Sequence, residues 1–306
     1  MPRHISILFP GQGSQSTGML NRHSTDLLKS YEDDINNLLG FNLVDIINNG
    51  PAGDLNMTSL TQPAILLASI LDFKDISNKL SLIPNVLCGH SLGEYSALVA
   101  ANSISLHEGL SLVHERGKLM EKCPKGSMCA VIDVDTDVIE DICSKVEDEI
   151  KTTVSPANLN SPRQIVISGT SEGVDTVINR LKDRGHKKCI KLKVSVAAHS
   201  KLMTNTLDQF RNELNKISFS SPEYPIIQNV DNKIAKNIDN LKENLLNQLV
   251  MPVQWINTMR LIKKYDGIVI ECGPNNVLSG IAKANGITNV YSTSSEDFFD
   301  KIKEVL

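Results

Sequence analysis

Residues Asn85–Asn102, NVLCGHSLGEYSALVAAN, combine a short apolar run, a glycine-flanked turn and a stretch with helical character. The run NVLCG is typical of a buried strand. The turn Gly89-His90-Ser91-Leu92-Gly93 fits G-x-S-x-G, a pattern that exposes a serine hydroxyl on a sharp strand-to-helix turn. The stretch therefore predicts an α/β fold in which Ser91 is a nucleophile. The alternative is a serine that only caps the helix.

A serine hydroxyl is a poor nucleophile and needs a base. The chain has seven histidines that are candidates for this role. His199, in VSVAAHSKLM, stands between an expected strand end and an expected helix start, where a base can reach across a cleft. His90 adjoins Ser91, and we expect its side chain to point elsewhere on the turn. The residues alone favour His199 without excluding the other histidines.

The segments on either side of this turn extend the α/β pattern. His4–Phe9 is an expected buried strand before a glycine-rich loop, and Gly267–Glu271 is another expected strand late in the chain. The apolar stripe along Leu106–Cys123 predicts a helix. Alternating strands and helices predict a large α/β-hydrolase-like domain with a mainly parallel sheet.

The texture of the sequence changes between Lys122 and Ser127, where Pro124 and Gly126 break the helical pattern. A strand, a charged helix, a strand, a second helix and a further strand are expected in the next about 70 residues, a pattern used by ferredoxin-like domains. The sequence therefore predicts a small ferredoxin-like α+β domain of residues 126–197. It would be inserted into the large domain, residues 1–125 and 198–306.

Length and composition narrow the function classes. The 306 residues are 41% hydrophobic and 22% charged, which excludes a disordered, collagen-like or coiled-coil chain. The net charge is −4 and the aromatic residues are few (7 Phe, 5 Tyr, 1 Trp), so no nucleic-acid partner is expected. The apolar run Ile5–Phe9 is too short for a signal peptide, and no stretch is long enough to span a membrane. Six cysteines without zinc or C-x-x-C spacing predict reduced thiols, a cytoplasmic location and no metal site.

Eight stretches of the sequence, in this order, resemble the malonyl-CoA:acyl-carrier-protein transacylases of fatty acid synthesis and the related acyltransferases of polyketide synthases. They are FPGQGSQ (9–15), LTQPA (60–64), GHSLGEYSAL (89–98), ERGKLM (115–120), ANLNSP (157–162), VSVAAHSKLM (194–203), MPVQW (251–255) and ECGPNNVLSG (271–280). The ordered set is far more specific than any one motif. The family's usual GPG is Gly273-Pro274-Asn275 here, and we expect the turn to survive because asparagine tolerates a left-handed backbone.

The resemblance implies roles for individual residues. Ser91 would be the acylated nucleophile, and His199 its base and then the acid that protonates the departing thiolate. The backbone N–H groups of Gln12 and Leu92 would form the oxyanion hole. Gln254 resembles the glutamine whose main-chain carbonyl orients the histidine, in the place of a triad carboxylate.

Arg116 resembles the arginine that pairs with the free carboxylate of malonate. The sequence gives a separate reason to notice it, because it falls on or beside the apolar stripe that includes Val113 and Met120. A guanidinium turned inward demands a partner, and its planar fork matches a carboxylate. Without the resemblance, a structural ion pair with a nearby Asp or Glu is the favoured interpretation.

These roles imply a two-step transfer of a malonyl group from malonyl-CoA to Ser91, and then to the phosphopantetheine thiol of an acidic acyl carrier protein. No bound cofactor is expected, since malonyl-CoA is a substrate, and the enzyme is expected to be a monomer without membrane contact. The alternatives are a polyketide synthase acyltransferase acting in trans, an acyl-carrier-protein acyl hydrolase and a non-catalytic docking protein on the same scaffold. A phosphate-binding loop at Gly11-Gln12-Gly13 is disfavoured, because Ser16 stands where that fingerprint needs glycine.

The segment Arg180–Lys193, RLKDRGHKKCIKLK, holds seven basic residues against one acid. One interpretation is a solvated face of the small domain. The sharper hypothesis is a docking patch for an acidic carrier protein or for the phosphates of coenzyme A, because the segment leads directly to His199. Its candidate contacts are Arg180, Arg184, Lys187, Lys188 and Lys191.

Overall fold

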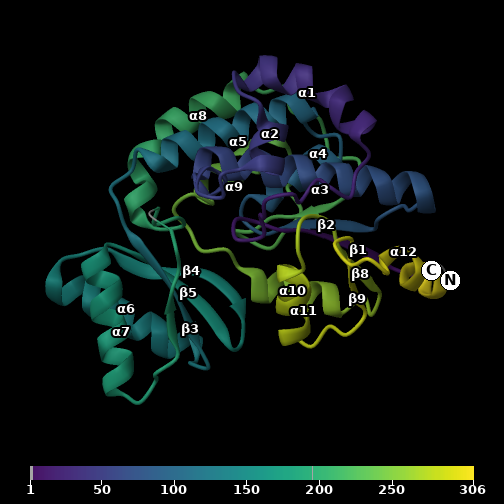
Figure 1. Ribbon diagram of the computed structural model, residues 1–306. Coiled ribbons are helices and arrows are strands. Elements are labelled where there is room, and N and C mark those ends of the chain that lie inside the picture. The colour runs from purple at the N-terminus through teal and green to yellow at the C-terminus, as the bar shows by residue number, and fades with distance from the viewer. Residues whose placement is uncertain (1–2, 195) are drawn as a thin grey trace.

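The computed structural model describes residues 3–194 and 196–306 and contains two β-sheets with helices packed around them (Figure 1). The first sheet has neighbouring strands that run parallel, in the order β7 (Ile226–Ile227), β2 (Val86–Gly89), β1 (Ile5–Phe9), β8 (Ile268–Glu271) and β9 (Val290–Ser292). Strands of a parallel sheet are covered on both faces and are therefore apolar along their length. The five residues of β1, ISILF, are all buried. The expected mainly parallel sheet is confirmed.

Helices cover both faces of this sheet. Ile7 and Phe9 of β1 belong to one apolar core, whereas Leu8 belongs to a second core together with Trp255 and Leu278. This alternation follows from the pleat, which points successive side chains to opposite faces. No helix in the described part of the chain is both long and apolar enough to cross a bilayer. The helices around the first sheet are α1 (Thr25–Leu39), α2 (Leu43–Asn49), α3 (Thr58–Leu80), α4 (Gly93–Ala100), α5 (Leu106–Glu121), α8 (Leu207–Lys216), α9 (Ile238–Asn247), α10 (Trp255–Lys263), α11 (Val277–Ala284) and α12 (Phe298–Val305).

The second sheet is smaller and antiparallel, in the order β4 (Val154–Ser161), β5 (Gln164–Gly169), β3 (Ser127–Ile132) and β6 (Cys189–Lys191). The helices α6 (Thr136–Ile150) and α7 (Ser171–Asp183) pack on one of its faces. The strand β4 is absent from the pattern predicted from the sequence. Pro156 and Asn158 interrupt its apolar alternation, and the register of β4 on β5 shifts between these two residues. The sheet therefore has four strands where the sequence predicts three.

Main-chain hydrogen bonds join the small sheet to the segment before α10, a helix that covers the first sheet. Val253, just before α10, donates its N–H to Ala157 of β4 at 2.8 Å and accepts from the N–H of Leu159 at 3.0 Å. The face of the small sheet opposite α6 and α7 includes Met128, and Ala198 packs against it. Because Ala198 precedes His199, the small sheet supports the segment that brings this histidine to the first sheet.

Candidate active site

The turn between β2 and α4 holds Ser91 in an unusual backbone conformation. Ser91 has a φ of +52°, in the left-handed region that non-glycine residues rarely occupy. A Cβ at Gly89 would overlap the backbone of Gly93, and a Cβ at Gly93 would overlap the carbonyl group of Phe9. Only glycine therefore fits at either position. The expected strand, sharp turn and helix around Ser91 are confirmed, and strain of this kind concentrates at functional sites.

His199 lies beside Ser91, although 108 positions separate the two residues in the chain. Its Nε2 is 2.8 Å from Ser91 Oγ, and its Nδ1 is 2.6 Å from the backbone carbonyl oxygen of Gln248. A carbonyl oxygen only accepts, so Nδ1 carries the ring proton and donates it. Nε2 is then free to accept the proton of the Ser91 hydroxyl. This is the arrangement of a nucleophile and its base.

The carbonyl that orients His199 belongs to Gln248, so the role predicted for Gln254 is wrong. The Gln254 carbonyl instead accepts a hydrogen bond from Asn232 Nδ2 at 2.9 Å. Gln248 caps the C-terminus of α9, where carbonyl groups lack an intrahelical donor and can accept from elsewhere.

The environment of His199 keeps its imidazole neutral. His199 is 2% exposed, and this burial lowers its pKa to about 3, with a further contribution from the positive charge of Arg116. A neutral imidazole is the form that accepts a proton. An anion bound at Arg116 would offset that charge and make His199 more basic.

The guanidinium of Arg116 is buried without an ionic partner. Arg116 is 1% exposed and donates to the side-chain oxygens of Gln62 at 2.9 Å and Gln248 at 3.0 Å. It also lies over the ring of Tyr95, 5.3 Å from its centroid. Within residues 3–194 and 196–306 it meets no carboxylate at ion-pair distance, and its Nε has no acceptor. The structural ion pair is therefore wrong, and a buried cation with neutral partners is suited to an anionic ligand.

A cavity of about 110 Å³ opens beside Ser91 and His199. Met120 contributes to its wall from the helices around the first sheet, and Met128 contributes from the small sheet. Flexible thioether side chains adapt to the shape of a ligand. The cavity thus lies where the two sheets meet, with the Ser91 hydroxyl on its wall.

Gln12 and Leu92, the residues predicted to form the oxyanion hole, both lie near Ser91. Gln12 lines the cavity, and Leu92 directly follows Ser91 at the start of α4. Neither backbone N–H group has a hydrogen-bond acceptor among the residues that the structure describes. N–H groups at a helix start are unpaired within the helix and attract negative charge.

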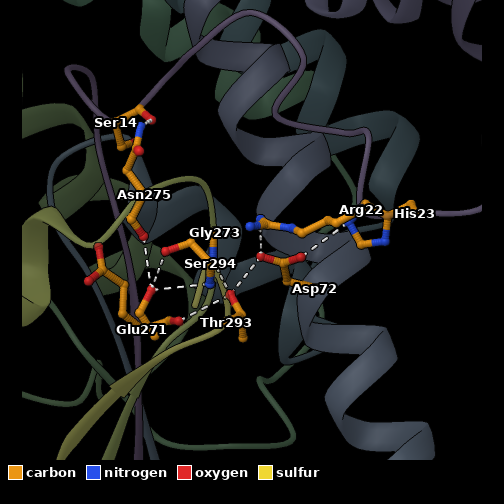
Figure 2. A network of polar contacts seen from close by, with 10 residues as sticks. Ser14, Arg22, His23, Asp72, Glu271, Gly273, Asn275, Thr293 and Ser294 are labelled. Atoms are coloured by element: carbon orange, nitrogen blue, oxygen red, sulfur yellow. Dashed lines mark hydrogen bonds and ion pairs between the residues drawn. The ribbon is translucent and has the colours of Figure 1, made fainter. Parts of the chain in front are cut away.

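A polar network at the carboxyl end of β8 holds the loop that carries Gln12 (Figure 2). Asn275 Nδ2 donates to the carbonyl of Ser14 at 2.6 Å, and Ser14 Oγ donates to the carbonyl of Gly11 at 2.8 Å. Asn275 has a φ of +63°, so the left-handed conformation expected for this turn is confirmed. The C-terminal turn therefore holds the loop at Ser14, and Ser14 in turn holds it at Gly11.

The basic segment lies along α7 and β6, at one edge of the small sheet, and part of it is paired within the molecule. Three of the candidate contacts form surface ion pairs: Arg180, Lys188 and Lys191 meet Glu149, Asp133 and Asp175, respectively. Arg184 and Lys187 form no ion pair with any residue that the structure describes. The positive charge available to a partner is thus smaller than the sequence suggests.

Several site residues were missed by the sequence analysis. Gln62 and Glu94 lie inside the motifs LTQPA and GHSLGEYSAL, but a polar residue on an apolar helix does not reveal which atoms it will meet. Asn229 lies outside every motif, and its Oδ1 accepts the backbone N–H of Ser91 at 2.7 Å. Contacts of this kind depend on tertiary placement.

Comparison with known proteins agrees with this geometry. A family model described as "Acyl transferase domain" matches residues 7–288. The malonyl CoA-acyl carrier protein transacylase of Escherichia coli (strain K12) is 38% identical over 290 residues, which cover 91% of this chain and 92% of that protein. The solved structure of the malonyl CoA-acyl carrier protein transacylase from Coxiella burnetii has a TM-score of 0.93 at 35% identity, covering 100% of this chain and 98% of that one. A malonyl-transacylase solved in complex with its type II PKS acyl-carrier protein has a TM-score of 0.91 at 35% identity, covering 99% of both chains.

These matches extend over nearly the whole chain and include the segments that carry Ser91, His199 and Arg116. The chain therefore belongs to the acyl transferase domain family.

Proposed function

We propose that the protein transfers a malonyl group from malonyl-CoA to the phosphopantetheine thiol of an acyl carrier protein, through a malonyl ester of Ser91. The observation that supports the malonyl group is the buried Arg116, whose partners Gln62 and Gln248 are both neutral. The free carboxylate of malonate would supply the missing negative charge and two acceptor oxygens. An acetyl group has no free carboxylate and would leave the guanidinium without an anionic partner.

The first half-reaction acylates Ser91. Ser91 Oγ attacks the thioester carbon while His199 Nε2, 2.8 Å away, takes the hydroxyl proton. The N–H groups of Gln12 and Leu92 stabilise the negative charge on the carbonyl oxygen in the tetrahedral intermediate. The carbon–sulfur bond then breaks, and His199 returns the proton to the departing thiolate of coenzyme A.

The second half-reaction repeats these steps with a different thiol. The phosphopantetheine sulfur of the carrier protein attacks the malonyl ester, and His199 takes the thiol proton. The bond between the malonyl carbon and Ser91 Oγ breaks, and the proton passes to Oγ. The thioesters and the serine ester are close in free energy, so the transfer should run in both directions.

The likeness to a malonyl-transacylase solved with a type II PKS carrier protein favours a second candidate, in which the acceptor is a polyketide carrier. The chemistry at Ser91 is the same in both cases. Rates of transfer to a fatty acid carrier protein and to a polyketide carrier protein would distinguish the two acceptors.

Intact-mass spectrometry tests the proposed function. After mixing with malonyl-CoA, the wild type should gain one malonyl group on Ser91, and holo carrier protein should then remove it. Ser91→Ala should stay unlabelled, and acetyl-CoA should label the wild type much less. Failure of the wild type to take up malonate, or equal labelling of Ser91→Ala, would contradict the proposal. The ratio of malonyl-carrier product to free malonate separates a transferase from a hydrolase.

We also propose that residues 126–197 are a ferredoxin-like domain inserted into an α/β-hydrolase-like domain of residues 1–125 and 198–306. The strand order β4-β5-β3-β6, with α6 and α7 on one face, supports this description. Ser91, His199, Gln248 and Arg116 all come from one chain, which supports a monomeric enzyme. Light scattering would test that state, and cell fractionation would test the proposed cytoplasmic location.

A further inference from the structure

Glu94 is a buried carboxylate that the proposed mechanism does not use. It lies in the first turn of α4, three positions after Ser91, and is 1% exposed. Its Oε2 accepts from Gln248 Nε2 at 2.7 Å and from the backbone N–H of Asn229 at 3.1 Å. Its Oε1 accepts from Gln228 Nε2 at 3.3 Å. Three donors on a buried carboxylate fix the orientation of its side chain.

The two partners of Oε2 hold the backbone of Ser91 from both sides. Asn229 Oδ1 accepts the Ser91 N–H at 2.7 Å, and Gln248 Nε2 donates to the Ser91 carbonyl at 3.1 Å. Asn229 Nδ2 also donates to the carbonyl of Gly89 at 2.6 Å. The left-handed φ of Ser91 is costly, and a strained residue persists only where its surroundings over-determine it.

Gln248 also connects this hydrogen-bond network to His199 and to the guanidinium of Arg116. Its backbone carbonyl accepts from His199 Nδ1 at 2.6 Å, and its Oε1 accepts from Arg116 at 3.0 Å. The amide of Gln248 can present Oε1 to Arg116 only while its nitrogen faces an acceptor on the other side. Two acceptors face that nitrogen, and Glu94 Oε2 at 2.7 Å is nearer than the Ser91 carbonyl at 3.1 Å.

We propose that Glu94 is a positioning residue for acyl transfer. Through Asn229 and Gln248, its carboxylate fixes the positions of Ser91, His199 and Arg116 relative to one another. The proposal rests on the proposed function, since it assigns the framework of the same site. Glu94 touches neither the acyl group nor the reacting atoms.

The competing explanation is that Glu94 only favours the start of α4, where an acidic residue interacts well with the helix dipole. Its hydrogen bonds argue against this role. All three donors come from outside α4, and two of them belong to residues that contact Ser91. An acid that serves only its own helix has no need of these partners.

The test compares Glu94→Gln and Glu94→Ala with a matched control. Glu94→Gln keeps one carbonyl oxygen for Gln248 and Asn229 but loses the charge, and Glu94→Ala loses every acceptor. The control is Glu271→Gln, because Glu271 is equally buried and accepts two N–H groups of α11 at 2.9 and 2.7 Å, without contact to Ser91 or its partners. Circular dichroism and thermal unfolding normalise each rate to folded protein.

Two rates are measured, and the first does not depend on the acyl substrate. Phenylmethanesulfonyl fluoride forms a sulfonate ester with Ser91 Oγ, with loss of fluoride and transfer of the hydroxyl proton to His199. The rate of this labelling, followed by intact-mass spectrometry, reports the nucleophilic reactivity of Ser91. The second measurement is steady-state malonyl transfer to the carrier protein, analysed for kcat and for the KM of the carrier.

We expect both the labelling rate and kcat to fall about 100-fold in Glu94→Ala and about tenfold in Glu94→Gln, since small displacements of reacting groups cost factors of this size. The KM of the carrier should stay constant, and Glu271→Gln should retain wild-type rates per folded molecule. Wild-type labelling and turnover in both Glu94 variants would overturn the proposal. A wild type that reacts with the sulfonyl fluoride but takes up no malonate would instead overturn the proposed function.

Discussion

Asp72 and Arg116 are buried charges on two helices that pack against each other, α3 and α5, and the protein treats them in opposite ways. Asp72 is 3% exposed and is surrounded by matching groups (Figure 2). One of its oxygens pairs with Arg22 and accepts from Thr293 Oγ1 at 2.7 Å, and the other lies 3.1 Å from His23 Nε2. Its charge is satisfied by the protein itself.

Arg116, by contrast, has no carboxylate at ion-pair distance among the described residues. Its acceptors are the amide oxygens of Gln62 and Gln248, and its Nε has no acceptor among the described residues. Burying a charge is expensive unless it is paired, so a protein that leaves one unpaired forgoes stability at that point. This difference indicates that the charge of Asp72 is structural, whereas the charge of Arg116 is available to a ligand. Variants of Arg116 and Asp72 test that distinction.

Replacing Arg116 should produce the largest effect. We expect kcat/KM for malonyl-CoA to fall about 100- to 1,000-fold in Arg116→Ala, because a buried carboxylate would lose its charged hydrogen-bond partner. Activity with acetyl-CoA, which has no free carboxylate, should change far less. Steady-state kinetics with both thioesters measure the ratio. An unchanged preference for malonyl-CoA would show that Arg116 does not read the carboxylate and would remove the contrast with Asp72.

The position of Arg116 could be anticipated, whereas its surroundings could not. The apolar stripe that includes Val113 and Met120 predicts an inward guanidinium, and Arg116 is buried as expected. Periodicity cannot tell which side chains from other elements will meet it. Gln62 is 54 positions away and Gln248 is 132 positions away, so these contacts arise only from tertiary packing.

The substitution Asp72→Ala should mainly lower stability. Removing one member of a buried ion pair leaves the other charge uncompensated, and we expect a loss of about 3 kcal/mol in the free energy of unfolding. Arg22 is 27% exposed, which keeps the loss at the lower end of the range for fully buried pairs. Urea denaturation followed by circular dichroism measures it.

Turnover per folded molecule should be unchanged in Asp72→Ala. A large loss of kcat at full folding would contradict the view that this cluster is structural. The network of Figure 2 also steadies the Gln12 loop through Asn275, so Asn275→Ala is a useful comparison. It removes the contact to that loop and leaves the Asp72 pairs intact.

His199 differs from both Asp72 and Arg116, because burial keeps its side chain neutral. Burial lowers its pKa to about 3, so below about pH 6.5 the unfolded chain binds a proton that the folded protein excludes. Stability must therefore fall as the pH falls through this range. From pH 7.5 to pH 5 this single group should cost about 2 kcal/mol.

The measurement compares the unfolding free energy of the wild type and His199→Gln at the two pH values. Glutamine does not titrate, so the variant should lose about 2 kcal/mol less than the wild type, while other groups contribute equally to both. Equal losses would mean that the pKa of His199 in the folded protein is close to its ordinary value, which would contradict the lowering by burial.

The limits of sequence reasoning are clearest where function uses the backbone. Ser91 and His199 are recognisable because their side chains are chemically distinctive and stand at a strand–helix turn and a strand end. A carbonyl oxygen is present at every residue, so nothing in the sequence distinguished Gln248 from Gln254 as the partner of His199. The same holds for β4, whose pairing with β5 accommodates Pro156 by a shift in register. Parallel strands such as β1 were predictable because burial on both faces makes them uniformly apolar.

The smallest effect is expected for the exposed charges of α7 and β6. Surface charges act through a screened field, and they change association rates more than affinity. Arg184 and Lys187 are unpaired within the described residues, whereas Lys188 meets Asp133, so among the candidate contacts the first two have their charge available to an acidic carrier. We expect Arg184→Glu with Lys187→Glu to lower kcat/KM for the carrier about three- to tenfold at low salt, and almost not at all at high salt.

The matched control is Lys301→Glu with Lys303→Glu on α12, which makes the same change in net charge at the other side of the molecule (Figure 1). A purely global effect of charge would slow the carrier reaction equally in both double variants. A local docking surface slows it only in the Arg184 and Lys187 pair, and leaves the malonyl-CoA half-reaction untouched. Wild-type rates at low salt in the Arg184 and Lys187 variant would assign the segment to a solvated face.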